Sequence, residues 1–202
     1  IGRAIAVSLA RRGCNLALAD IDESGMAATA ELVRGNGIKV SQHRVDVSDR
    51  AAVAAFPDRV AADHGGADLL VNNAGVADGG TFEQVSDEDF EWLFEINFWG
   101  VVRMTRAFLP LLRASEDARV VNISSVYGLI APPEQAAYSA SKFAVRGFSE
   151  ALRHELEGSG VSVTVVHPGG VNTSIAEKAR IPAGVAEEEI ARRRERYRKL
   201  LR

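Results

Sequence analysis

The stretch that decides the fold reads Ser124-Ser125-Val126-Tyr127-Gly128 and is followed by Tyr138-Ser139-Ala140-Ser141-Lys142. An α-helix repeats every 3.6 residues, so Tyr138 and Lys142 project from one helical face and can serve one reacting centre. Ser125 follows the apolar run 120–123, which predicts a buried strand. Side chains at the carboxyl end of a parallel strand lie where α/β proteins place their chemistry. We therefore expect one site to contain Ser125, Tyr138 and Lys142.

The remainder of the chain alternates between two periodicities. Runs of β-branched and apolar residues predict short strands, and apolar residues spaced three and four apart predict helices. Such alternation is typical of a parallel sheet covered by helices on both faces, a doubly wound three-layer α/β/α fold. The predicted strands cover residues 15–19, 39–45, 68–71, 120–123 and 161–166, and the main helices cover 2–12, 23–34, 49–64, 101–112 and 134–157.

Two further motifs follow predicted strands. Asn72-Asn73-Ala74-Gly75 comes after residues 68–71, and His167-Pro168-Gly169-Gly170-Val171-Asn172-Thr173 comes after residues 161–166. Small residues at such ends let a ligand approach the backbone, while Asn amides can also tie neighbouring strands together. A ligand-binding role and a purely structural role both remain open for the first motif.

In this order and spacing, the motifs before residue 175 resemble the short-chain dehydrogenase/reductase family. The resemblance implies a Rossmann-like fold and an oxidoreductase that transfers a hydride between NAD(P) and an alcohol or carbonyl substrate. It assigns Tyr138 as general acid/base, with Ser125 and Lys142 beside it. It also makes Asn97 the residue that holds a water linking the lysine to solvent, although a buried structural amide is the alternative. The catalytic set is Asn97, Ser125, Tyr138 and Lys142.

The resemblance also implies the residues that hold the dinucleotide. Asp20, at a strand end, accepts hydrogen bonds from the adenosine ribose hydroxyls and repels a 2′-phosphate, which favours NAD over NADP. Asp20 could instead cap the next helix, and Asp46 could belong to a helix start rather than contact adenine. The implied cofactor-binding residues are Ile1, Gly2, Asp20, Asp46, Val47, Asn73, Ala74, Gly75, Tyr138, Lys142, Pro168, Gly169, Val171 and Thr173.

The resemblance makes the chain look truncated at both ends. Ile1-Gly2 matches only the tail of the family's glycine-rich pyrophosphate turn. We expect the family's first strand, which lies between the strands near 15–19 and 68–71, to be missing. Residues 1–202 are then one dinucleotide-binding and catalytic domain, in which 174–202 cover the substrate and no final strand follows. We expect such a chain to bind dinucleotide weakly.

The composition indicates which classes of binding partner and which cellular location to expect. The 202 residues are 47% apolar, enough for a sizeable core, and the net charge is −3. This charge gives no general reason to expect nucleic acid or an anionic membrane, and the basic run 190–202 is interpreted as a solvated helix face. The lone Cys14 excludes an intrachain disulfide, and four histidines without ligand spacing predict no metal site. Short apolar runs and the absence of a charged leader predict a soluble, cytoplasmic protein.

The proposed chemistry depends on the pKa of one phenol. An unperturbed tyrosine titrates near 10, so reaching about 7 needs roughly 4 kcal/mol of preferential phenolate stabilisation. We expect the Lys142 ammonium and the oxidised nicotinamide to supply it. The alternative is a non-catalytic relative that senses nucleotide or acts as a scaffold. The resemblance further implies a homo-oligomer, a dimer or tetramer, packed partly through residues 101–112.

Overall fold

The computed structural model describes residues 1–182, 185, 188, 189 and 192. The interpretation of the basic run 190–202 therefore falls outside the described residues, apart from Arg192. Among the residues that are described, no helix is long and apolar enough to cross a membrane.

Strands and helices alternate along the described chain, as the sequence predicts. The strands are β1 (Leu16–Asp20), β2 (Val40–Arg44), β3 (Leu69–Asn72), β4 (Ala118–Ile123) and β5 (Val161–Val166). The α-helices are α1 (Gly2–Ala10), α2 (Glu23–Val33), α3 (Arg50–His64), α4 (Asp87–Phe94), α5 (Gly100–Arg113) and α6 (Ala136–Glu155). A π-helix, η1 (Glu95–Trp99), joins α4 to α5, and a short 3-10 turn, η2 (Val126–Gly128), follows β4.

The strands are all parallel and form two separate sheets. β1 pairs with β2, and β3, β4 and β5 form the second sheet in that order. β1 and β3 face each other without pairing, which agrees with the expectation that another strand separates residues 15–19 from 68–71 in the family. Ile123 lies opposite Val166, so β4 and β5 end together. This register brings the loops after both strands to one edge.

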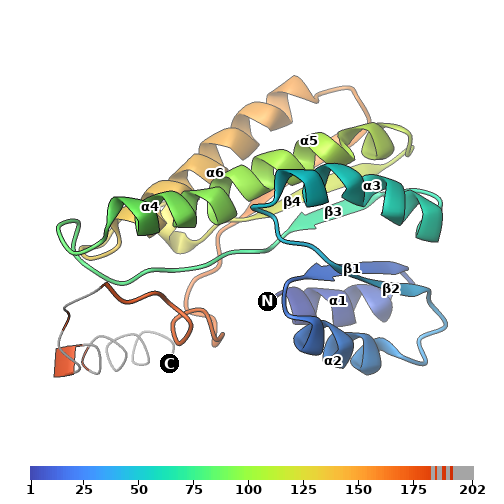
Figure 1. The fold of residues 1–202 in the computed structure, drawn as a ribbon. Helices are drawn as coiled ribbons and strands as arrows, with labels where there is room; N and C mark the ends of the chain where they lie inside the picture. Colours follow the sequence, from blue (N-terminus) through green and yellow to red (C-terminus); the bar gives the residue numbers. More distant parts are fainter. Residues whose placement is uncertain (183–184, 186–187, 190–191, 193–202) are drawn as a thin grey trace.

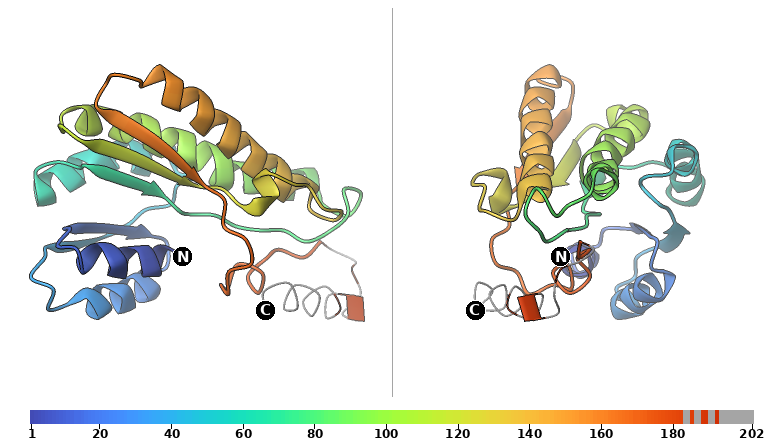
Figure 2. Two further views of the ribbon diagram at one scale, coloured as in Figure 1. Left: turned by 180° about the vertical axis from the view of Figure 1, so that it is seen from behind. Right: turned by 60° about the vertical axis from the view of Figure 1, so that its left-hand side comes forward.

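Helices cover the strands in layers (Figures 1 and 2). α1 and α2 lie on one side of β1 and β2, and α3, α5 and α6 lie on the opposite side of the strands. The largest apolar cluster lies beneath these three helices and includes Phe56, Val120 and Val163. A second cluster, with Leu16 and Val33, joins α1 and α2 to β1. The arrangement is a parallel α/β fold of the Rossmann-like type, as predicted.

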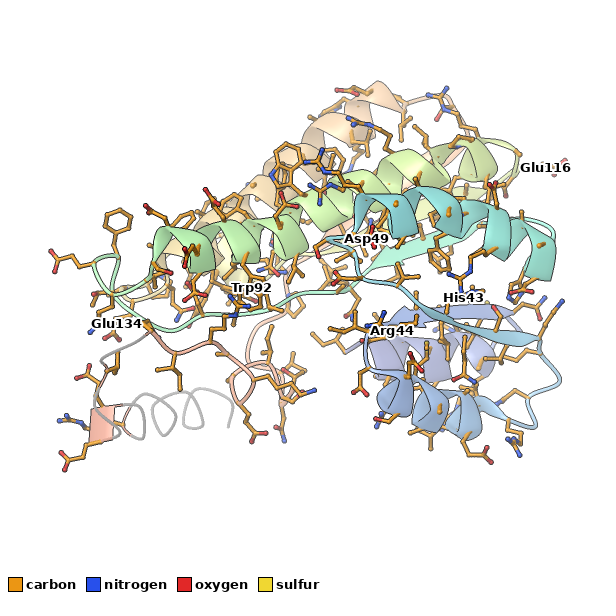
Figure 3. The ribbon with its side chains drawn as sticks, in the orientation of Figure 1. His43, Arg44, Asp49, Trp92, Glu116 and Glu134 are labelled. Carbon is orange, nitrogen blue, oxygen red and sulfur yellow. The ribbon has the colours of Figure 1, made fainter. Side chains whose placement is uncertain are left out.

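Side-chain caps fix where several helices begin. Ser86 accepts a hydrogen bond from the Asp89 amide at the start of α4. Asp49 accepts from the amides of Ala51 and Ala52 at the start of α3 and lies at the head of that helix in Figure 3. Such caps satisfy N–H groups that have no partner within the helix.

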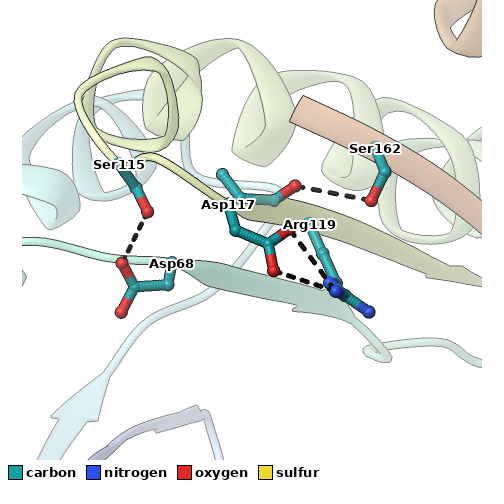
Figure 4. Close-up of polar contacts among 6 residues, drawn as sticks. Asp68, Ser115, Asp117, Arg119 and Ser162 are labelled. Carbon is teal, nitrogen blue, oxygen red and sulfur yellow. Dashed lines mark hydrogen bonds and ion pairs between the residues drawn. The ribbon is translucent and has the colours of Figure 1, made fainter. Parts of the chain in front are cut away.

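A cluster of polar contacts fixes the second sheet at the end remote from the loops just described (Figure 4). Ser115 donates to Asp68 at 2.7 Å, Arg119 pairs with Asp117 at 3.0 Å, and the Ser162 hydroxyl donates to the Ala118 carbonyl. These contacts connect the amino ends of β3, β4 and β5. Predicted site residues lie at the opposite, carboxyl ends of these strands.

The gap between β1 and β3 makes a testable prediction about backbone amides. Because N–H groups alternate sides along a parallel strand, the contacts Leu16 N–H to Lys39 and Arg119 N–H to Asp68 fix which groups face the gap. The N–H groups that face the gap between β1 and β3 are those of Ala17, Ala19, Leu69 and Val71. In residue-resolved hydrogen exchange, we expect them to exchange faster than those of Leu18 and Leu70 by about two orders of magnitude.

Leu18 and Leu70 are internal controls, because they lie in the same strands and bond to β2 and β4. Equal protection of the two sets of amides would show that β1 and β3 are paired in solution.

Candidate active site

A cavity of about 1810 Å³ opens at the carboxyl ends of β3 and β4 and extends between β1 and β3. Every residue that the sequence assigned to catalysis or cofactor binding lines it, with the exception of Asn97. These residues come from segments far apart in the chain. The predicted site residues are thus brought together in space, whatever their individual roles.

Tyr138 and Lys142 lie one turn apart on the buried face of α6. Both are almost fully buried, with 8% and 4% of their surface exposed. The Lys142 Nζ donates a hydrogen bond to the Ile123 carbonyl at 3.1 Å, and it lies 5.6 Å from the centre of the Tyr138 ring. The end of β4 therefore anchors the ammonium beside the phenol.

Ser125 lies directly after β4 and faces the same helix. Its backbone is extended, and its hydroxyl accepts a hydrogen bond from the Tyr127 amide at 3.1 Å. The Ser125 side chain also lowers the pKa of Tyr138, so it lies near the phenol. The rings of Tyr127 and Tyr138 meet edge to face with centroids 6.1 Å apart. Ser125 and the two tyrosine rings are thus gathered at the wall of the cavity.

The loop after β5 supports Ser125, a contact that the sequence analysis missed. The Nδ1 atom of His167 lies 3.0 Å from the Ser125 carbonyl oxygen. Because a carbonyl oxygen only accepts, this nitrogen must donate. The Val126 amide also donates to the Pro168 carbonyl at 2.8 Å. The sequence did contain a hint of this contact, because His167 immediately follows the predicted strand 161–166 and Ser125 closely follows the predicted strand 120–123.

Asn97 lies behind the cavity wall, in the π-helix η1. It is fully buried, and its amide bonds to the Val76 N–H at 2.8 Å, the Val76 carbonyl at 2.9 Å and the Ser141 hydroxyl at 3.2 Å. A Cβ atom at Gly75 would lie 3.2 Å from its Oδ1 and 3.5 Å from the Lys142 Nζ. Asn97 and Lys142 therefore approach each other across Gly75. The structural role of Asn97 is visible, and its water-holding role stays a prediction.

At the opposite end of the cavity, the carboxylate of Asp20 is exposed. Its Oδ1 accepts a hydrogen bond from the Asp22 amide, and it is Asp22 that caps α2 by accepting from the Gly25 amide. The alternative role of Asp20 as the cap of that helix is therefore not observed. Asp46 accepts from the Ser48 amide and hydroxyl instead of capping α3.

The first Asn of the Asn-Asn-Ala-Gly motif connects strands, and the second faces α1. Asn72 donates to Asn122 at 2.8 Å and to Thr105 at 3.0 Å. A Cβ atom at Gly2 would lie only 2.7 Å from the Asn73 Nδ2. The backbone at the start of α1 therefore approaches Asn73 closely. A helix start, small residues and a distant carboxylate around one long cavity are compatible with an extended dinucleotide.

Burial sets the protonation of the two α6 residues. Burial lowers the pKa of Lys142 to about 8. Burial also raises the pKa of Tyr138, and the hydrogen bond from Ser125 acts in the opposite direction. We expected Lys142 to lower the pKa of Tyr138. In the protein without a bound cofactor the Tyr138 pKa is raised instead, because the loss of hydration outweighs the effect of neighbouring groups. Because both groups are buried, a charged ligand in the cavity would shift the pKa values of Tyr138 and Lys142 strongly.

Lys142→Met tests the cost of the buried ammonium. The folded pKa near 8 lies below the unfolded value of 10.5, so the penalty is complete below pH 8 and disappears as the pH rises towards 10.5. At about 1.4 kcal/mol per pKa unit, we expect the variant to be more stable than its parent by about 1–3 kcal/mol at pH 7. Urea unfolding at pH 7 and pH 9.5 measures the difference, which should shrink at the higher pH.

The matched control is Lys178→Met, because this lysine is exposed. We expect its stability to stay within about 0.5 kcal/mol of the parent at both pH values. A Lys142→Met protein that is less stable than the parent, or whose advantage is independent of pH, would contradict the assignment.

Comparisons with known proteins agree with this fold. The family model described as short chain dehydrogenase matches residues 1–183. The protein SadH of Mycobacterium tuberculosis is 46% identical over 193 residues, which cover 95% of this chain and 70% of SadH. The oxidoreductase UcpA of Escherichia coli is 40% identical over 178 residues, covering 88% of this chain and 67% of UcpA.

Solved structures show the same architecture. A short-chain dehydrogenase/reductase from Burkholderia phymatum in complex with NAD has a TM-score of 0.89 and 34% identity, covering 99% of this chain and 75% of that one. An alcohol dehydrogenase from Thermococcus sibiricus, complexed with 5-hydroxy-NADP, has a TM-score of 0.82 and 29% identity, covering 99% and 85%. With fold, motif positions and relatives in agreement, this chain belongs to the short-chain dehydrogenase/reductase family.

Proposed function

We propose that this protein is an oxidoreductase that transfers a hydride between NAD and an alcohol or carbonyl substrate, with Tyr138 as general acid/base. The observation that carries the proposal is the convergence of Ser125, Tyr138 and Lys142 on the cavity that also contains Asp20. Bound nicotinamide would supply the hydride chemistry and, when oxidised, a positive charge near the phenol. The protein then has to bind, orient and move one proton.

The three side chains divide this work. Ser125, which lines the cavity with the phenol, holds the substrate oxygen against it. Tyr138 takes the alcohol proton during oxidation and returns it during reduction. Lys142 favours the phenolate by its charge and can bind the nicotinamide ribose hydroxyls. Because the site is largely buried, each of these interactions is stronger than it would be in water.

Asp20 supports NAD over NADP. Its carboxylate is exposed at the end of β1, where it can accept from ribose hydroxyls and would repel a 2′-phosphate. The nearby Arg3 is already occupied, since its guanidinium donates to the Thr29 hydroxyl at 3.1 Å and to the Gly25 carbonyl at 3.2 Å. Arg3 is therefore already engaged and is a poor partner for a 2′-phosphate.

The substrate end of the cavity is partly apolar. Tyr127 and Ile130 line it beside the catalytic residues, and Ile130 is 57% exposed. This favours a substrate with an apolar portion next to the reacting carbon. A non-catalytic nucleotide sensor is less favoured, because such a protein has no use for a serine, a buried phenol and a buried ammonium around one cavity. A homo-oligomer and a cytoplasmic location stay predictions.

Tyr138→Phe tests the acid/base assignment. Removing the phenol oxygen leaves the ring packing in place, so we expect the dissociation constant for NAD to stay within about threefold while turnover falls by about 10²–10⁴. The measurement is NADH formation against a panel of secondary alcohols, with NAD binding followed separately by calorimetry.

Ser139→Ala is the matched control, because it deletes a buried hydroxyl that has no hydrogen-bond partner within the described chain. It should turn over at the parental rate. Equal turnover of Tyr138→Phe and parent would remove Tyr138 from the mechanism.

His167 provides a second test, because its ring donates to the carbonyl of Ser125. We expect His167→Val to lower kcat by about tenfold or more through misplacement of Ser125, with NAD affinity unchanged. His167→Asn keeps a donor and should recover most of the rate. Indistinguishable Asn and Val variants would show that the hydrogen bond does not position Ser125.

A further inference from the structure

The loop after β3 contains a buried carboxylate that the proposed mechanism does not use. Asp78 is only 5% exposed, and neither of its side-chain oxygens has a hydrogen-bond partner within the described chain. Buried carboxylates are almost always paired, because losing hydration without a partner is costly. A carboxylate in this position calls for a physical explanation.

The segment after β5 is what buries Asp78. The Arg180 amide donates to the Ala77 carbonyl at 3.0 Å, and the Gly79 amide donates to the Arg180 carbonyl at 3.1 Å, so a parallel bridge pairs Asp78 with Arg180. Pro182 packs so closely on Gly80 that a Cβ atom there would lie 2.7 Å from its ring. Residues 174–182 are thus fastened directly over the Asp78 loop.

The same segment covers the candidate site. Ile175 and Ala179 pack against the apolar cluster that contains Tyr138 and Leu93. Figure 2 shows the chain after β5 on the side of the second sheet opposite to α5 and α6, next to the start of α1. Residues 174–182 therefore form a lid on the cavity, a name we keep for this segment.

Arg180 connects the lid to α4. The Arg180 guanidinium donates to Asp89 at 2.7 Å and lies 3.6 Å from the centre of the Trp92 ring. Figure 3 shows Trp92 on the side of α4 that faces the lid. Because the guanidinium is committed to Asp89 and Trp92, it leaves Asp78 without a counter-charge.

Burial and the Asp89 carboxylate oppose the ionisation of Asp78. α4 contributes Asp89, the lid contributes Arg180, and α6 contributes the uncharged phenol of Tyr138 through its contact with Ala77. Burial raises the pKa of Asp78, the backbone N–H of Asp78 itself lowers it, and the Asp89 carboxylate raises it again. A neutral Asp78 is therefore compatible with a closed lid, whereas a carboxylate is better hydrated when the lid is open.

We propose that Asp78 is a proton-controlled release for the lid: the lid is closed over the cavity while Asp78 is neutral and opens when Asp78 ionises. The sign follows from linkage, since the closed state binds the proton more tightly and is lost as the pH rises. The consequence for substrate entry and product release rests on the proposed function. The motion itself can be measured without any turnover.

Trp92 is the reporter, because opening separates its ring from Arg180. In a Trp99→Phe background it is the only tryptophan, and its emission is recorded from pH 4.5 to 9 while circular dichroism monitors the overall fold. We expect a red shift of the emission as the pH rises. Asp78→Asn should keep the low-pH spectrum throughout, and Arg180→Gln should give the high-pH spectrum throughout.

Asp87→Asn is the matched control, because it removes an exposed carboxylate from the first turn of α4. It should follow the parental transition. Cleavage after Lys178 by a lysine-specific protease gives a second readout: the rate should rise with pH in the parent relative to Asp78→Asn. A parental spectrum that does not change with pH, or an Asp78→Asn protein that keeps the transition, would overturn the proposal. Loss of turnover with an intact transition would instead count against the proposed function alone.

Discussion

The site depends on one buried contact, the hydrogen bond between the Lys142 ammonium and the Ile123 carbonyl. It connects the last residue of β4 to the middle of α6, and so it sets the distance between Ser125, just after the strand, and Tyr138, one turn earlier on the helix. An ammonium in this position loses most of its hydration, which is unfavourable for stability. The same burial places the Lys142 ammonium, whose pKa is lowered, next to the phenol of Tyr138.

Much of this arrangement could be predicted from the sequence. The alternation over residues 161–166 predicted the bounds of β5 as the structure has them, and the predicted helix 134–157, which bears Tyr138 and Lys142, agrees closely with α6. These features depend on local periodicity and on backbone groups that need a nearby partner. Residues that are neighbours on a helix face, or that follow parallel strands, converge for geometric reasons that the sequence already contains.

Other features depend on contacts between distant segments, and local patterns do not report them. The π-helix that turns Asn97 inward is one register change in a continuous apolar helix, and nothing in Glu95–Trp99 distinguishes it from ordinary α-helix. Asp78 lies beside Gly79 and Gly80 in a loop, and no local pattern indicates that a segment far along the chain, residues 174–182, buries it. The raised Tyr138 pKa likewise reflects the whole enclosure, not the lysine four residues along.

The open edges of β1 and β3 have a consequence beyond the site. Each edge presents a row of backbone donors and acceptors with no strand beside it in the part of the chain that the structure describes, and Leu69 at the second edge is 36% exposed. Unprotected edges of this kind are templates on which extended peptide from another molecule can assemble. Two such edges facing each other carry the backbone groups needed to pair with one extended strand between them, and such a strand would join the two sheets into one.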